Sequence, residues 1–196
     1  MPIIERTPRK CFDVFTGHLR ALVAATVTAR HPIGEIPTQT RLQVGFREDV
    51  PIAVPVDTDF GRLHFYLGQA LEAIEESGRY RLTTQQYWYR LQHGASLREQ
   101  AVIRWEYEAT MGRSRHARHH AQLRADLDIG DGTLDLNRAH LPTGWVTIEE
   151  VIRFLIVDLG MVPPCGDRWP DVLEQSERAF FEDFTGKRYK PSPERP

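Results

Sequence analysis

Cysteine and lysine are both scarce in this sequence. The two cysteines among 196 residues, Cys11 and Cys165, are too few and too far apart for a disulfide framework, which favours the reducing cytoplasm as the location. Only three lysines contribute to the 25 basic residues, and we attribute this preference for arginine to a GC-rich bacterial genome rather than to phosphate binding. The formal net charge of -2 excludes a global attraction to nucleic acid, so any site for a polyanion must be local.

Long apolar runs and complete cofactor motifs are also missing. The longest apolar candidate, residues 19–27, is too short to cross a bilayer and has polar borders, so we expect neither a membrane segment nor an export signal. The sequence contains no phosphate-binding glycine loop, no dinucleotide fingerprint and no nucleophile elbow. We therefore predict no cofactor and no metal.

The residues that are present indicate one globular domain. Hydrophobic residues make up 41% and charged residues 27% of the chain, and its length suffices to bury a core without disulfides or metal. We predict a single α+β domain over residues 1–186 and a disordered, basic, proline-rich tail over residues 187–196. The sheet is expected to be antiparallel, with three to four strands, and about four helices are expected to pack mainly on one of its faces.

Two helices are predicted in the first half of the chain. Apolar residues three and four positions apart predict the first helix over residues 8–30. The second is predicted from about residue 57 to Gly78, because helical spacing recurs there and glycine suits a helix end. Its expected apolar face consists of Phe60, Leu63, Leu67, Ala70, Leu71 and Ile74. Four prolines between the two helices predict an irregular segment, with one short strand over residues 40–46.

Two more helices are predicted in the second half. Thr147 followed by Glu150 forms a capping box, so a helix is expected to begin near Ile148. The final helix is expected to begin after Asp167 and to give way at Gly186.

Alternation and aromatic content predict strands over residues 80–93, 101–111 and 116–126. The connection between the last two is short, which favours an antiparallel hairpin. In this hairpin Arg104, Glu106, Arg118 and His120 share one face, whereas His119 points to the opposite, core side.

The polar face of this hairpin has the composition that metal-free RNA cleavage needs. A carboxylate or an imidazole removes a proton from the 2′-hydroxyl, a second imidazole protonates the leaving oxygen, and arginine stabilises the charge on phosphate. Glu106 and His120 are the candidate acid and base, and Arg104 and Arg118 are the candidate phosphate clamps. The plainer alternative is a solvated face with mixed charges, as antiparallel sheets commonly have.

A metal site is the remaining alternative for the histidines. If the segment were helical, His116 and His120 would lie one turn apart, a spacing found in many zinc sites. In a strand the same two residues are about 14 Å apart, at a rise of about 3.4 Å per residue. The strand prediction therefore argues against a metal.

Aromatic residues beside Arg90 could stack bases, as they do in proteins that bind single strands. Tyr87, Trp88 and Tyr89 are consecutive, however, so at least one of them must face the core if the segment is a strand.

A family resemblance rests on the order of three pieces: Tyr87-Trp88-Tyr89-Arg90, then Arg104-Trp105-Glu106-Tyr107, then residues 116–122. Their layout resembles that of small, poorly characterised prokaryotic proteins, some of which are similar to toxin components of toxin–antitoxin pairs. The resemblance covers about a quarter of the chain. It implies a small α+β fold and an RNA target, and it assigns no catalytic residue. Two hypotheses follow: an RNA-directed, nuclease-like or toxin-like protein, and a non-enzymatic regulatory or assembly protein that binds a protein partner.

Overall fold

The computed structural model describes residues 5–30, 33–110, 117–128, 133–136, 139–184 and 189. Eight strands form one antiparallel sheet in the order β1-β2-β4-β5-β6-β7-β10, with β3 paired to β4, and β8 and β9 form a separate ribbon. The α-helices are α1 (Pro8–Thr26), α2 (Ile148–Val157) and α3 (Trp169–Ala179), with the short turns η2 (Gly166–Arg168) and η3 (Phe180–Phe184) at either end of α3. The strands are β1 (Ile33–Pro37), β2 (Arg41–Phe46), β3 (Val54–Thr58), β4 (Gly61–Glu76), β5 (Arg79–Gln92), β6 (Ala101–Glu108), β7 (His119–Leu123), β8 (Asp126–Asp128), β9 (Thr133–Asp135) and β10 (Leu141–Pro142).

The prediction of three to four strands and about four helices is wrong, although the fold is α+β and its sheet is antiparallel. The largest error is the helix predicted over residues 57–78, which is the long strand β4. Gly61 has φ +102° and ends the turn after β3, and Gly78 has φ +76° in the hairpin turn between β4 and β5 rather than at a helix end. Leu63, Leu67 and Leu71 fit a helical spacing, but they also share one face of a strand, where the buried Phe65 completes the alternation.

The segment predicted to be irregular contributes two further strands. The predicted strand over residues 40–46 is confirmed as β2, and β1 and β3 lie on either side of it in the chain. Proline is compatible with both added strands because each has one free side: Pro37 ends β1 at the edge of the sheet, and Pro55 lies in β3, which pairs only with β4.

Several other predicted elements are confirmed. The first helix is α1, which ends at Thr26 rather than at residue 30, and strands β5 and β6 lie where aromatic content and alternation place them. The strand predicted over residues 116–126 is confirmed only in part, because β7 covers His119–Leu123 and Asp126 belongs to β8. β6 and β7 pair antiparallel, with Trp105 opposite Ala121. The predicted connection over residues 111–115 lies outside the described residues, as does the predicted tail apart from Tyr189.

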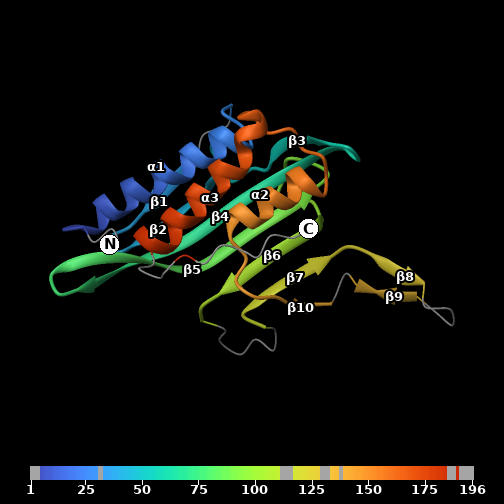
Figure 1. Cartoon of the computed structure of the whole chain (residues 1–196). Coiled ribbons are helices and arrows are strands. Elements are labelled where there is room, and N and C mark those ends of the chain that lie inside the picture. Colours follow the sequence, from blue (N-terminus) through green and yellow to red (C-terminus); the bar gives the residue numbers. More distant parts are fainter. Residues whose placement is uncertain are drawn as a thin grey trace.

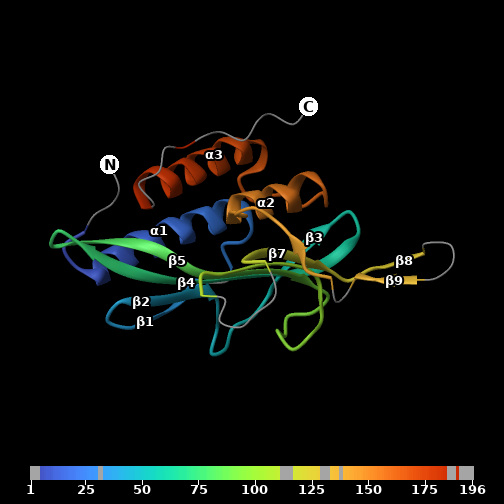
Figure 2. The same ribbon diagram turned by 90° about the horizontal axis from the view of Figure 1, so that it is seen from below.

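All three α-helices cover the same face of the sheet (Figures 1 and 2). Alternate residues of the central strands point into this layer and are buried there, including Phe65 and Leu67 of β4 and Tyr87 and Tyr89 of β5. The helices contribute buried residues that include Phe12, Phe15, Leu19, Ile152, Leu155 and Leu173. The core therefore lies between the sheet and the helices, and the opposite face of the sheet is left for polar side chains. Within the part of the chain that the structure describes, no helix combines the length and apolarity needed to cross a membrane.

The predicted capping box at the start of α2 is confirmed. Thr147 Oγ1 accepts a hydrogen bond from the Glu150 backbone N–H at 3.2 Å, and Glu150 Oε2 accepts one from the Thr147 N–H at 2.9 Å. Replacing Thr147 with alanine should lower the free energy of unfolding by about 1 kcal/mol, because it leaves a helix N–H without its acceptor. Urea denaturation of the two proteins measures this difference, and Thr40→Ala in the exposed β1–β2 turn is the control. A Thr147→Ala protein as stable as the wild type would contradict the prediction.

Candidate functional site on the open face of the sheet

The face of the sheet opposite the helices carries the residues that the sequence singled out. Trp88 of β5 lies opposite Glu106 of β6, and Glu106 lies opposite His120 of β7. The next row along the strands places Arg90 opposite Arg104 and Arg104 opposite Gln122. Since cross-strand neighbours on one face are close enough for their side chains to touch, the two rows form one continuous polar surface.

Glu106 and His120 contact each other directly. His120 Nε2 is 3.2 Å from Glu106 Oε2, and His120 Nδ1 is 3.0 Å from the carbonyl oxygen of Ala117. Both ring nitrogens therefore face oxygen acceptors, an arrangement that suits the doubly protonated, cationic imidazole. Both side chains are largely but not completely buried, so a ligand on this face could still reach them.

The three arginines of this face differ in their positions. Arg104 Nε is 3.6 Å from Glu106 Oε1, so the carboxylate lies between an arginine and a histidine. Arg118 is exposed just before β7, and its carbonyl oxygen accepts a hydrogen bond from Glu108 N. Arg90 donates to the carbonyl oxygens of Leu97 and Glu99, so its guanidinium holds the loop between β5 and β6. The structure thus brings Arg104, Glu106 and His120 together and places Arg118 at the border of the group.

His140 is a member of this site that the sequence did not predict. The pairing of β10 with β7 brings it beside Gln122, whose Nε2 contacts both nitrogens of the His140 ring. The ring centroids of His120 and His140 are 4.7 Å apart. Only this pairing between distant parts of the chain supplies the second imidazole, and no local pattern around residue 140 indicates it.

Beside this polar group lies a groove of about 270 Å³ with a floor of glycines. Gly34, Gly45 and Gly68 are cross-strand neighbours on β1, β2 and β4, and Gly68 lies opposite Trp88. A Cβ atom on Gly45 would come within 2.3 Å of the Leu67 carbonyl oxygen, and one on Gly68 within 2.6 Å of the Tyr66 hydroxyl. Because these glycines have no side chains, the groove remains open above the backbone. It continues along the same cross-strand row toward Trp88, Glu106 and His120.

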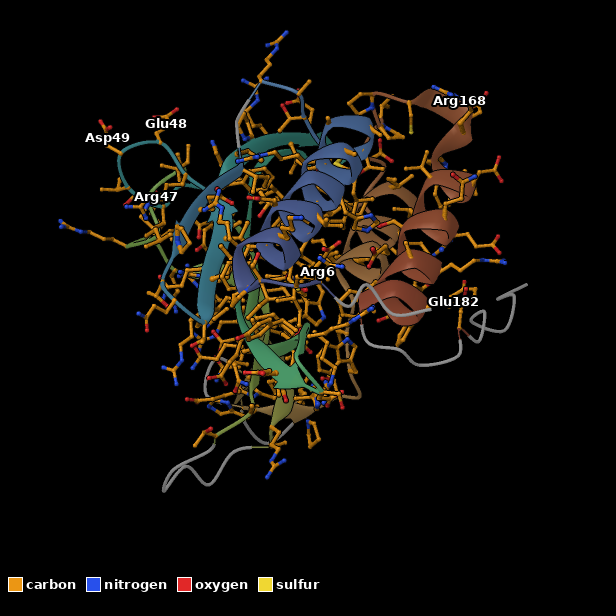
Figure 3. All side chains as sticks on the ribbon, turned by 90° about the vertical axis from the view of Figure 1, so that its left-hand side faces the viewer. Arg6, Arg47, Glu48, Asp49, Arg168 and Glu182 are labelled. Carbon is orange, nitrogen blue, oxygen red and sulfur yellow. The ribbon has the colours of Figure 1, made fainter. Side chains whose placement is uncertain are left out.

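Two loops project from this open face beside the groove (Figure 2). The loop after β2 and the loop after β5 are joined where Ala53 N donates to Ala95 O at 3.0 Å and where Ile52 and Ser96 form a β-bridge. Arg47, Glu48 and Asp49 lie on the first loop, on the side of the molecule away from Arg168 and Glu182 of the helical layer (Figure 3). Arg47 lines the groove, so the groove has a positive charge on one wall.

The aromatic residues of β5 divide between the two faces as strand alternation predicts. Tyr87 and Tyr89 are buried under the helices, their rings stacked 4.8 Å apart, and Trp88 lies on the open face. His119 is on the helix side, as predicted, with its ring stacked 4.3 Å from that of Tyr107. Burial is the main reason why the pKa of His119 lies below its usual value, and the charge of Arg118 lowers it further. Of these residues, only Trp88 is available to the open-face site.

The structure describes no group of three or more histidine, cysteine, aspartate or glutamate side chains arranged to hold a metal ion. His116, the other residue of the metal alternative, lies outside the described residues. His120 lies in a strand, which removes the helical spacing on which that alternative depended.

In comparisons with protein-family models, curated proteins and solved structures, this chain matches none. The resemblance to toxin-like proteins therefore stays a prediction, and a function has to be argued from the site alone.

Proposed function

We propose that this protein binds single-stranded RNA across the open face of its sheet and cleaves it without a metal. The proposal is carried by one observation: the glycine-floored groove, Trp88, Glu106 and His120 follow one another in a single cross-strand row. Proteins recognise single-stranded RNA mainly by stacking unpaired bases on aromatic side chains and by pairing its backbone with arginines. A base stacked on Trp88 would place its sugar and phosphate beside Glu106 and His120.

The proposed chemistry is an internal transfer of the phosphate ester. The 2′-oxygen forms a bond to phosphorus while the bond from phosphorus to the 5′-oxygen breaks. His140 accepts the 2′-hydroxyl proton, and the cationic His120 donates a proton to the leaving 5′-oxygen, so the products are a 2′,3′-cyclic phosphate and a 5′-hydroxyl. Glu106 stabilises the charged ring of His120, and Arg104 and Arg118 stabilise the charge on the phosphate.

Binding is tested separately from cleavage by replacing Trp88 with alanine. Loss of one stacked base should weaken RNA binding by about 1–3 kcal/mol, or roughly 5- to 150-fold in Kd. Fluorescence anisotropy with a labelled, single-stranded 2′-deoxy or 2′-methoxy oligonucleotide measures this without turnover. Phe60→Ala is the matched control, because Phe60 is an exposed aromatic residue in the turn between β3 and β4, away from the groove lining. Equal affinities of the wild type and Trp88→Ala would contradict the proposed platform.

A second candidate function, binding of a protein partner, is favoured by a different surface. Phe60, Val157 and Val162 are 75%, 60% and 85% exposed. The hydrogen bond from Asp59 N to Leu159 O brings the β3–β4 turn beside the end of α2, where the two valines lie. Exposed apolar side chains that gather in this way are typical of interaction surfaces. A partner retained by the wild type and lost by Phe60→Ser, with RNA affinity unchanged in Trp88→Ala, would favour this candidate over RNA binding.

A further inference from the structure

A cavity of about 350 Å³ lies between the sheet and the helical layer, on the face opposite the groove. Its walls combine apolar and aromatic side chains, among them Leu71, Tyr107, Trp145 and Phe180, with the polar residues Arg81, Thr83 and Thr84. The charge of Arg81 is paired with Glu76, whose Oε1 is 2.7 Å from Arg81 Nε. A volume of this size with aromatic walls is typical of sites for small molecules. The RNA proposal makes no use of this cavity.

A smaller space of about 20 Å³ adjoins the cavity and shares Phe15, Thr84, Trp145 and Phe180 with it. This space is large enough for about one water molecule or one small polar group. It also reaches Gln69 and Glu149, two buried polar side chains that do not line the larger cavity.

Gln69 leaves a hydrogen-bond acceptor unused at this inner end. Its side chain is 6% exposed, and its Nε2 donates to the Tyr89 hydroxyl at 2.7 Å. Its Oε1 is buried and has no hydrogen-bond partner among the described residues. A buried carbonyl oxygen without a donor is costly and rare in native proteins, so a water molecule or a ligand group that donates a hydrogen bond here would be stabilised.

Glu149 adds a carboxyl group to the same end. It lies in the first turn of α2, is 2% exposed, and accepts a hydrogen bond from Ser176 Oγ at 2.5 Å. Ser176 Oγ is in turn 3.0 Å from His18 Nε2, so one residue from each helix meets here. Both Gln69 Oε1 and the Glu149 carboxylate are acceptors, so this end suits a ligand that donates hydrogen bonds and carries a positive charge.

We propose that this cavity binds a small aromatic amine, with the ring against the aromatic side chains of the larger part and the ammonium group between Gln69 and Glu149. The site is separate from the open face of the sheet, and it does not depend on the RNA proposal.

The affinity should depend on pH. Burial raises the pKa of Glu149 to about 7, and the charge of Glu177 raises it further, while the hydrogen bond from Ser176 opposes this. An ammonium ion binds the ionised carboxylate better than the neutral one, so affinity should increase as the pH rises from 6 toward 8. The titratable side chains around this carboxyl are His18, Tyr87, Tyr89, Glu150 and Glu177.

Isothermal titration calorimetry of the full chain with three matched probes tests the proposal. The probes are 2-phenylethylamine, 2-phenylethanol and 3-phenylpropanoate, which share a ring and differ in the head group. At pH 8 the amine should bind at least about tenfold more tightly than the carboxylate, the factor that one charge-assisted hydrogen bond supplies. Absence of amine binding at millimolar concentration, or equal binding of all three probes, would overturn the proposal.

Two variants locate the site. Gln69→Leu and Glu149→Gln should each reduce the preference for the amine by about tenfold, and Gln43→Leu on the open face should leave it unchanged. A preference that survives both core variants would also overturn the proposal. If a variant fails to fold, the proposal is tested on the wild type alone, by the relative affinities of the three probes and by the pH dependence of amine binding. RNA cleavage by the wild type should be the same with and without the amine. The test of the amine site is therefore independent of whether the open face cleaves RNA.

Discussion

Replacing His120 with glutamine is expected to lower the rate of RNA cleavage by about 10²- to 10⁴-fold, the usual contribution of a positioned acid or base. Glutamine retains a polar side chain of similar reach, but it cannot donate a proton to the leaving 5′-oxygen. Cleavage of an end-labelled, single-stranded RNA in the presence of a chelator measures the rate and tests the absence of a metal requirement. A DNA strand of the same sequence should not be cleaved, because it has no 2′-hydroxyl.

The matched control is His93→Gln, since His93 is an exposed histidine in the loop between β5 and β6, and it should retain full activity. Glu106→Gln should lower the rate by a smaller factor than His120→Gln, because it removes the negative partner of the ring but not the ring itself. If Glu106→Ala and His120→Ala each leave RNA cleavage and toxicity in cells unchanged, the enzymatic proposal must be dropped.

Replacing Glu149 with glutamine is expected to make the protein less sensitive to pH between about 4.5 and 7. Burial raises the pKa of this carboxyl from 4.5 to about 7 in the folded protein. The folded state therefore holds the proton more tightly than the unfolded state. The resulting stabilisation is complete below pH 4.5 and is lost as the pH rises through 7, and it amounts to roughly 3 kcal/mol at about 1.4 kcal/mol per tenfold change in proton affinity.

Urea denaturation of the wild type and Glu149→Gln at a series of pH values measures this difference. The variant should gain stability relative to the wild type as the pH rises from 5 to 8, because it has no carboxyl group to ionise in the core. Glu182→Gln changes an exposed glutamate after α3 and should follow the wild-type curve (Figure 3). Parallel curves for the wild type and Glu149→Gln would show that this carboxyl titrates equally in both states.

The fold could be predicted where local sequence decides it, and not where distant pairing decides it. The capping box of Thr147 and the alternation of β6 depend on neighbouring residues, and both predictions are confirmed. In β4 the apolar residues satisfy a helical and a strand period at once, and only pairing with β2, β3 and β5 selects the strand. The prolines over residues 31–57 argued against strands in this segment. Pro37 and Pro55 nevertheless lie in strands, each of which pairs with a neighbouring strand on one side only.

The site shows the same division. The period of two residues in the hairpin placed Glu106 and His120 on one face and His119 on the other, and the structure has these three side chains in those positions. His140 and the glycine floor could not be predicted, because each depends on strands that are distant in the chain. Arg90 has a role that sequence could not separate from that of Arg104, since only the course of the β5–β6 loop shows what its guanidinium binds.

The hydrogen-bonded chain from His18 through Ser176 to Glu149 has a consequence for how the helices are aligned. Contacts between apolar helix faces have no preferred direction, so they fix the relative position of the helices only through the shapes of the packed side chains. The hydrogen bonds of this polar chain, which has one residue on each of α1, α2 and α3, require one particular arrangement of the three helices. These three side chains therefore fix the positions of the helices relative to one another. A homologue that lacked them would need other interactions to hold its helices in one register over the sheet.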